Sequence, residues 1–376
     1  MPDPIAFIDL QAQRKRLGEP LNRAIMKAVE SGAWVMGPQV AEFEKKLADF
    51  AGVKHCIACA NGTDALLIVL RAWNVGPGDA VFVPAFTFAA SAEVVALVGA
   101  EPVFVDVFED TYNLDPASLE KAIAMVRKEG RLKPRVVMPV DLFGQSADYD
   151  AIEPIVKREG LKMLCDAAQG FGALYHGRRC GGMGDASSTS FFPAKPLGCY
   201  GDGGASFTND DELAELLRSI RIHGQGADKY ENVRIGVNSR LDTIQAAILI
   251  EKLSIFQDEI EKRDAIAARY NKKLGHSNAI RVPRVIADST STWAQYTIQV
   301  PDRDKLAADL KARGVPTAIY YPTPLSKQKG YAHFPSAGAP VSEKIGMTVI
   351  SLPMHPYLDK ATQDRIIDAV LESVGS

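Results

Sequence analysis

Residues 186–204 read Ala-Ser-Ser-Thr-Ser-Phe-Phe-Pro-Ala-Lys-Pro-Leu-Gly-Cys-Tyr-Gly-Asp-Gly-Gly, and their two charged side chains are Lys195 and Asp202. Short strands are predicted at Ser187–Phe192 and Ala205–Thr208, so Lys195 lies where a strand ends in a glycine-rich loop. Among aromatic, proline and glycine residues, desolvation lowers the pKa of an amine and makes it a nucleophile. A structural lysine with its stem on apolar surface is the alternative for this segment taken alone.

Strands and helices alternate on the N-terminal side of this stretch. The predicted strands cover Ala80–Val83, Pro102–Val107, Arg135–Val140 and Leu161–Cys165, and the predicted helices cover Ala89–Val98, Ala117–Lys128 and Tyr149–Glu159. This alternation predicts an α/β fold with a mostly parallel sheet covered by helices on both faces. Ligands of such sheets bind at the carboxyl ends of the strands.

Helical spacing dominates two longer segments, Glu19–Ala51 with a turn at Gly37-Pro38, and Leu241–Leu274 with Asp242 as an N-cap or first-turn acid. The remainder of the chain is α+β. Its predicted elements are strands at Thr297–Val300 and near Thr317–Tyr321, a helix at Lys305–Arg313 and a helix from Lys360. We therefore predict a large domain over residues 1–250 and a small C-terminal domain over 251–376, entered through the long helix as a bridge.

Composition excludes several classes of protein. The chain has 376 residues, 47% of them apolar and 24% charged, with a net charge of −3 and no basic block, which argues against a nucleic-acid partner. No apolar run reaches membrane-spanning length, and the first residues do not resemble a signal peptide. Five cysteines are too few for a disulfide framework. These features predict a cytoplasmic enzyme without a membrane partner.

Several common motifs of catalytic and metal sites are missing from the sequence. No G-x-G-x-x-G, P-loop, G-x-S-x-G or H-E-x-x-H pattern occurs. Cys56 and Cys59 match C-x-x-C, but they lie in a predicted strand, where positions three apart point to opposite faces. We expect buried structural cysteines and no metal site.

An acid follows one of the apolar strands. Leu161–Cys165 ends in Asp166-Ala-Ala-Gln169, which places Asp166 at the ligand-binding edge of the sheet, where a helix N-cap is the simpler alternative. Paired with the Lys195 amine, this acid gains a specific meaning. Pyridoxal phosphate enzymes use a lysine for the Schiff base and an acid that keeps the pyridine nitrogen protonated.

Two further segments end strands at the same edge. Asn61-Gly-Thr-Asp-Ala65 precedes an apolar helix, and a Gly-Thr turn there offers free N–H groups and a hydroxyl to a phosphate. Pro84-Ala-Phe-Thr-Phe88 brings aromatic rings that could stack on a cofactor. Taken alone, a plain N-cap explains the first segment equally well, and core packing is the better explanation of the second.

Together, in this order, these features resemble the pyridoxal phosphate sugar aminotransferases of the DegT/DnrJ/StrS type. The resemblance runs from Phe7-Ile-Asp-Leu10 to Ser351-Leu-Pro-Met-His-Pro356. Its specific motifs are Asn61–Ala65, Asp166–Gln169, Ser190-Phe-Phe-Pro-Ala-Lys195, Gly201-Asp-Gly-Gly204 and Gly236-Val-Asn-Ser-Arg-Leu-Asp-Thr-Ile-Gln-Ala-Ala247. It implies fold type I, the aspartate aminotransferase-like architecture, with a large mixed sheet and a smaller C-terminal domain.

The resemblance also implies how the cofactor would be bound. Lys195 would carry pyridoxal phosphate as a Schiff base and shuttle a proton. Asp166 would pair with the pyridine nitrogen, Gln169 would lie near the ring hydroxyl, and Phe88 would stack on the ring. The phosphate would be held by Gly62, Thr63 and Ser190, together with Asn238 from the neighbouring subunit of a homodimer with shared active sites.

The resemblance further implies a nucleotide-sugar substrate, with glutamate as amino donor and pyridoxamine phosphate as the form that attacks the keto-sugar. Arg240 would face an anionic part of the nucleotide-sugar. The sequence looks most like the branch that aminates C3 of UDP-2-acetamido-2-deoxy-3-oxo-glucuronate in bacterial O-antigen synthesis. That branch tends to have a His-Tyr pair where this chain has Tyr320-Tyr321, the other residues expected at the substrate.

Three alternatives remain open at this point. One is a 3-aminotransferase that acts on a dTDP-3-keto-6-deoxyhexose. Another is a sugar dehydratase on the same fold, although those relatives replace the lysine with histidine, so Lys195 counts against it. The last is a non-catalytic regulatory or scaffold protein, which would not need the lysine, the acid, the glutamine and the phosphate turn together.

Overall fold

The computed structural model of the chain describes residues 4–228 and 230–375, and its centre is a seven-stranded sheet with strand order β1-β9-β8-β5-β4-β2-β3. The strands are β1 (His55–Cys59), β2 (Asp79–Pro84), β3 (Glu101–Val105), β4 (Lys133–Val137), β5 (Lys162–Asp166), β8 (Ala186–Ser190) and β9 (Gly204–Thr208). Pairs from β3 to β8 are parallel, and β9 pairs antiparallel with both β8 and β1. The predicted mostly parallel α/β sheet is confirmed.

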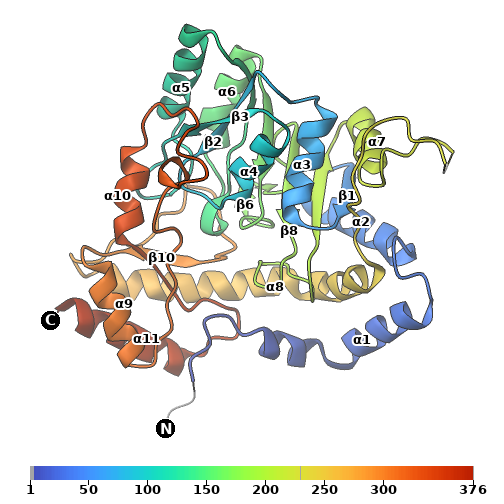
Figure 1. Cartoon of the computed structure of the whole chain (residues 1–376). Coiled ribbons are helices and arrows are strands. Elements are labelled where there is room, and N and C mark those ends of the chain that lie inside the picture. The colour runs from blue at the N-terminus through green and yellow to red at the C-terminus, as the bar shows by residue number, and fades with distance from the viewer. Residues whose placement is uncertain (1–3, 229, 376) are drawn as a thin grey trace.

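Helices cover both faces of this sheet (Figure 1). The covering helices are α2 (Pro38–Ala51), α3 (Gly62–Ala72), α4 (Ala90–Leu97), α5 (Pro116–Glu129), α6 (Tyr149–Glu159) and α7 (Asp211–Ile220). In strand β1, side chains point alternately to the two faces of the sheet. Cys59 packs with α3, α4 and α7 on one face, and Cys56 packs with α2 on the other. The two cysteines are free and buried on opposite faces, as the strand prediction requires.

Local sequence sets the ends of these helices. Asp115 accepts a hydrogen bond from the amide of Ala117 and is followed by Pro116, and Gly130 ends α5 at φ 68°. Helix α6 begins at the cap Asp148 and ends at Gly160 in the same left-handed conformation. An acid before the first turn and a glycine after the last are the expected signals of helix boundaries.

Helix α8 (Thr243–Leu274) runs along the bottom of the molecule, with the N-terminal helix α1 (Leu10–Glu30) packed on its outer side (Figure 1). Its first half contributes Leu249 and Phe256 to the core beneath the sheet. Its last turns contribute Tyr270 and Leu274 to a second core. The long helix predicted from the sequence is thus present. Asp242 occupies its N-cap position with an extended backbone, but the Asp242 side chain makes no capping hydrogen bond.

The second core lies at the C-terminal end of α8. It includes the antiparallel pair β10 (Tyr296–Gln299) and β11 (Val349–Leu352), with α9 (Arg303–Ala312) and α11 (Lys360–Gly375). Helix α10 (Pro340–Thr348) contributes Ile345 to a separate cluster that also holds Val349. The minor elements are β6 (Leu174–Tyr175), β7 (Arg178–Arg179) and the short 3₁₀ turns Leu142–Gly144 and Leu325–Lys327. Ile5 also packs in this core, so the N-terminal segment contacts the C-terminal one. The division into residues 1–250 and 251–376 stays a prediction.

Two sequence expectations differ from the structure. The predicted strand near Thr317–Tyr321 is wrong, because only Ala318 pairs, with Ser351. Pro316 and Pro322 flank this segment, and proline has no N–H to donate to a sheet. At the other end of the chain, α1 begins at Leu10, where Asp9 caps it by accepting from the amide of Ala12 at 2.8 Å, so the sequence missed its first turns. Gly18, with φ 54°, interrupts α1 directly before Glu19, where the predicted helical segment starts.

Candidate active site

A cavity of about 470 Å³ lies at the carboxyl ends of β1, β2, β4, β5 and β8. It is lined by nine of the residues singled out in the sequence: Gly62, Thr63, Phe88, Asp166, Gln169, Ser190, Lys195, Tyr320 and Tyr321. These residues are spread over most of the chain, and the sheet and the segment after α9 bring them together. The structure therefore brings these residues together at the strand ends, where ligands of such sheets bind.

The Gly-Thr turn forms the first turn of α3. Asn61 caps this helix by accepting from the amide of Asp64 at 2.8 Å, which leaves the N–H groups of Gly62 and Thr63 without acceptors inside the helix. A β-carbon added to Gly62 would lie 2.5 Å from the Cβ of Ser190. The glycine is thus required by contact with β8, and the helix N-terminus faces the Ser190 end of that strand.

Lys195 lies in the same cavity, just after β8. Its residue is partly exposed, but its amine is surrounded by protein atoms, and this desolvation lowers the pKa of Lys195 while the nearby charge of Asp166 opposes the shift. The Lys195 backbone amide donates to the carbonyl oxygen of Phe192 at 2.8 Å. A lysine with a lowered pKa has a larger neutral, nucleophilic fraction at neutral pH.

Asp166 is buried at the end of β5, with 5% of its surface exposed. Its Oδ2 accepts from the hydroxyl of Ser91 at 2.9 Å, and its Oδ1 accepts from the backbone amide of Ala168 at 3.1 Å. Burial raises the pKa of Asp166, whereas these two hydrogen bonds and the Lys195 amine lower it. The carboxylate is thus held in a fixed orientation and is still under-compensated, so a cationic partner in the cavity would stabilise its charge.

A hydrogen bond joins Gln169 and Tyr321, which both line the cavity. The Gln169 Nε2 donates to the Tyr321 hydroxyl at 3.2 Å, and its Oε1 accepts from the amide of Phe143 at 2.7 Å. Burial raises the pKa of Tyr321, so its hydroxyl keeps its proton. The ring of Phe88 lies 6.3 Å from that of Tyr321, between centroids, and is 55% exposed. The exposed ring can therefore contact a ligand.

Asn238 and Arg240 do not line this cavity in the described chain. Asn238 is exposed and pairs with Ile222, while the neighbouring Ser239 is buried and accepts from the amide of Ala60 at 3.2 Å. The segment is therefore anchored close to the Gly-Thr turn that starts α3, with Asn238 at the surface. The single chain does not test their predicted role.

Some cavity residues were not found from the sequence. Gln295 lines the cavity, as do Thr87 and Asp202, which the quoted motifs contained without an assigned role. Ser91 does not line the cavity but binds the buried Asp166 carboxylate. Ser91 is the hydroxyl within the apolar helix α4, a signal that could have been noticed. Gln295 precedes β10 in an irregular segment and carries no periodic signal, yet its Oε1 is buried without a partner among the residues that the structure describes.

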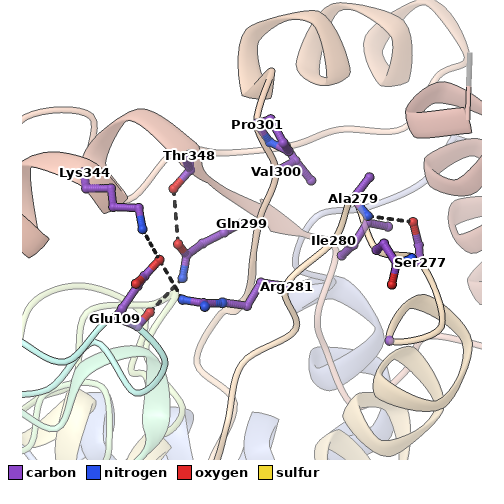
Figure 2. Close-up of a pocket in the computed structure, with 12 residues that line it drawn as sticks. Glu109, Ser277, Ala279, Ile280, Arg281, Gln299, Val300, Pro301, Lys344 and Thr348 are labelled. Carbon is purple, nitrogen blue, oxygen red and sulfur yellow. Dashed lines mark hydrogen bonds and ion pairs between the residues drawn. The ribbon is translucent and has the colours of Figure 1, made fainter.

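A second hollow, of about 610 Å³, lies away from this site. Figure 2 shows Glu109 there, between Arg281 and Lys344, at 2.6 and 2.9 Å from their nitrogen atoms. Gln299 also donates to the Glu109 carbonyl oxygen at 2.7 Å. These ion pairs join the segment after β3 to the C-terminal core, and the residues lining the hollow include none of the motif residues quoted above. We assign it a structural role.

Comparison with known proteins decides the family. The family model described as the DegT/DnrJ/EryC1/StrS aminotransferase family matches residues 15–371. The chain belongs to this family. Like the family, the chain is therefore an aminotransferase.

Individual relatives of this chain are also aminotransferases or share their fold. A UDP-2-acetamido-2-deoxy-3-oxo-D-glucuronate aminotransferase of Pseudomonas aeruginosa is 50% identical, over 98% of this chain and 99% of the relative. The crystal structure of a DegT DnrJ EryC1 StrS aminotransferase from Brucella abortus is 56% identical with a TM-score of 0.97, covering 99% of this chain and 100% of that one. NtdA from Bacillus subtilis, solved with bound cofactor PMP, is 29% identical with a TM-score of 0.89, covering 100% and 86%. The fold is that of fold type I aminotransferases.

The described part of the aminotransferase has neither a membrane-spanning helix nor a cluster of metal ligands. None of its helices has the length and apolar character needed to cross a membrane. No group of three or more histidine, cysteine or acidic side chains placed to hold a metal ion occurs over residues 4–228 and 230–375.

The raised pKa of Asp166 makes a prediction for the ligand-free aminotransferase. The folded state binds this proton more tightly than the unfolded state, so the resulting stability is fully present below a pH of about 3.9 and is lost as the pH rises through the folded pKa. Asp166→Asn removes this dependence. We expect Asp166→Asn to become more stable relative to the original protein as the pH rises from 4 to 7, measured by urea unfolding.

Asp304→Asn, whose carboxylate is 81% exposed, is the matched control and should show no comparable change. A stability difference for Asp166→Asn that is the same at both pH values would contradict the assigned pKa shift.

Proposed function

We propose that the cavity binds pyridoxal phosphate and that Lys195 is the amine that holds it. The structure offers three features that fit this group. They are a lysine whose pKa is lowered by burial, a buried acid that lacks a full cationic partner, and a helix N-terminus pressed against Ser190. Phosphate suits the last feature because helix N-termini present free N–H groups and positive dipole ends.

The residues then take the following roles. When bound, pyridoxal phosphate supplies an electron-poor ring that stabilises negative charge on the substrate carbon. Lys195 binds the cofactor as a nucleophile and moves a proton at that carbon. Asp166, oriented by Ser91 and the Ala168 amide, holds the proton on the pyridine nitrogen. Both roles need the Lys195 amine and the Asp166 carboxylate to reach the same cavity, which both residues line.

The remaining contacts orient the ring. The N–H groups of Gly62 and Thr63 and the hydroxyl of Ser190 bind the phosphate. Gln169, fixed by the Phe143 amide and bonded to Tyr321, lies near the ring hydroxyl, and Phe88 stacks on the ring face. Cofactor and substrate are both anionic, so placed donors of this kind are needed in a chain whose net charge is −3.

The substrate we propose is UDP-2-acetamido-2-deoxy-3-oxo-glucuronate, aminated at C3 with L-glutamate as donor, in bacterial O-antigen or lipopolysaccharide synthesis. The observation that carries this is the 50% identity, over nearly the whole chain, to a relative with that substrate in its name. Tyr320 and Tyr321 lie in the cavity, where their hydroxyls can bind the sugar. A dTDP-3-keto-6-deoxyhexose is the alternative substrate, and it has no comparable support here.

A homodimer with shared active sites would complete the cavity. Lys195 is the one cationic side chain among the described residues lining it, too few for a phosphorylated cofactor and a nucleotide diphosphate. Asn238 and Arg240 of a second copy would supply the missing donors. Ile235 and Trp34, which flank this segment, are 82% and 58% exposed, as expected for a surface that a partner covers. Five buried free thiols favour a reducing compartment, the cytoplasm.

The role of Lys195 can be tested by absorption spectroscopy. Purified protein with pyridoxal phosphate should be yellow, and glutamate should bleach the visible band as the amine passes to the cofactor. Lys195→Ala should lose at least about a thousandfold in turnover, since the nucleophile and proton carrier is removed. Lys162→Ala, which removes an exposed lysine, is the control. A fully active Lys195→Ala protein would overturn the assignment.

A panel of keto-sugars tests the substrate. UDP- and dTDP-linked 3-keto-sugars, with and without a C6 carboxylate, are each incubated with enzyme and glutamate, and products are identified by mass spectrometry. We expect amination of the UDP-linked uronate at least about tenfold faster than of the other sugars, the factor that one well-placed ionic contact supplies. Amination of a dTDP-sugar alone would refute the uronate proposal.

Mixed dimers test the sharing of sites. Lys195→Ala and Asn238→Ala subunits should each be weakly active alone, because every site lacks one group. Unfolded together and refolded, they should regain about a quarter of the original activity, since half of the dimers then hold one intact site. If mixing restores nothing although mixed dimers form, Asn238 does not act across the subunits.

A further inference from the structure

The loop between Lys195 and β9 is held from below by helix α8. Gln245, in the first turn of α8, accepts from the Tyr200 amide through Oε1 at 2.9 Å and donates to the Tyr200 carbonyl oxygen through Nε2 at 3.3 Å. The backbone N–H and carbonyl oxygen of Tyr200 are therefore both bound by the Gln245 side chain. This fixes the outer half of the loop to the helix that spans both cores.

Lys252 lies two turns farther along the same face of α8 and binds the loop at Gly198, nearer to Lys195 in the chain. Its ammonium donates to the carbonyl oxygen of Gly198 at 2.6 Å and lies 4.5 Å from the centroid of the Tyr200 ring. The side chain is buried, with 1% of the residue exposed. Gly198 itself cannot carry a side chain, because a β-carbon would lie 2.5 Å from the Pro193 carbonyl oxygen.

No carboxylate offsets this buried charge by contact within the described part of the chain. Glu259, two turns farther on, binds Gln13 at 2.9 Å and the hydroxyl of Tyr357 instead. Burial lowers the pKa of Lys252 to about 8, against the opposing effect of Glu259. A buried ammonium with only a carbonyl and a ring as partners is costly, so packing alone would favour methionine or leucine at this position.

The loop that Lys252 binds runs from Lys195, in the cavity lining, to Gly204, which lies against the Gly-Thr turn. It begins directly after Lys195, and Cys199 folds it back by donating from its amide to the Phe191 carbonyl oxygen at 2.7 Å. It also contains Asp202, which lines the cavity. At its end, Gly204 lies against the phosphate turn, where a β-carbon would be 2.3 Å from the Asn61 carbonyl oxygen.

We infer that Lys252 is a positioning residue: by binding the Gly198 carbonyl it fixes the loop that places Lys195 at one end of the cavity and Gly204 against the phosphate turn at the other. The inference rests on the proposed role of Lys195. It assigns to α8 a function in the site that neither the cofactor contacts nor the cavity lining reveals. The charge is retained because a cation binds a carbonyl oxygen about twice as strongly as a neutral donor.

The test compares Lys252→Met, which keeps length but removes the charge, with Lys252→Arg, which keeps the charge. Lys262→Met makes the same change on the exposed side of the same helix, where Lys262 pairs with Asp258, and serves as the control. Three quantities are measured: thermal unfolding of the cofactor-free protein, pyridoxal phosphate affinity from titration of the visible band, and kcat and KM for glutamate.

We expect Lys252→Met to fold with an unfolding temperature close to that of the original protein, and to bind the cofactor about tenfold more weakly, the loss for one charge-assisted hydrogen bond. Its kcat should fall about tenfold with little change in KM, because the misplaced amine affects the chemical step. Lys252→Arg should recover part of both losses, and Lys262→Met should show neither. Original cofactor affinity and kcat in Lys252→Met would overturn the inference.

A second variant guards against misfolding. Tyr200→Leu leaves Lys252 in place but removes the ring beside its ammonium, and it should weaken cofactor binding about threefold. If Lys252→Met does not fold and Tyr200→Leu binds cofactor normally, the inference is also overturned. Lys195→Ala, run alongside, separates the two proposals: full activity there would refute the role of Lys195, whereas the Lys252 variants report on the loop.

Discussion

The contact between the start of α3 and the strands β8 and β9 is the constraint on which the site depends. Gly62 meets Ser190, and Gly204 meets Asn61, at separations that leave no room for a β-carbon on either glycine. The sheet order β1-β9-β8 creates this approach, because β9 lies between the strand that precedes α3 and the strand that precedes Lys195. A helix N-terminus, a hydroxyl and an amine are thereby brought to one cavity by backbone packing.

Electrostatics then follow from burial. Asp166 and Lys195 both lose water in the cavity, so the pKa of the acid rises and that of the amine falls. Each shift is reduced by the charge of the other residue and, for Asp166, by Ser91 and a backbone amide. A ligand with a cationic ring nitrogen and an anionic phosphate offers each end of the cavity the charge it lacks. Under the proposed function, the nearly neutral chain would therefore recognise its anionic partners through a few fixed donors.

Much of this site could be predicted from sequence because each motif directly follows a strand. The carboxyl ends of parallel strands converge, so Asp166, Ser190 and Lys195 could be placed together without knowledge of the packing. Gln295 could not, since the segment before β10 reaches the cavity only through tertiary contacts, and the one signal for Ser91 was its hydroxyl within the apolar helix α4. The strand expected near Thr317–Tyr321 failed for a local reason, the flanking prolines. Asn238 and Arg240 remain predictions that a single chain cannot test.

Helix α8 links the fold to the chemistry more directly than its role as a bridge suggests. One stretch of it packs under the sheet and another builds the C-terminal core, so its axis is fixed at both ends. Gln245 and Lys252 project from this fixed axis to the loop after Lys195. A glycine-rich loop has high conformational entropy when free, and anchoring it on a rigid helix supplies the order that the amine requires. On this view, burying the Lys252 charge lowers the stability of the fold, and the same charge positions the loop that follows Lys195.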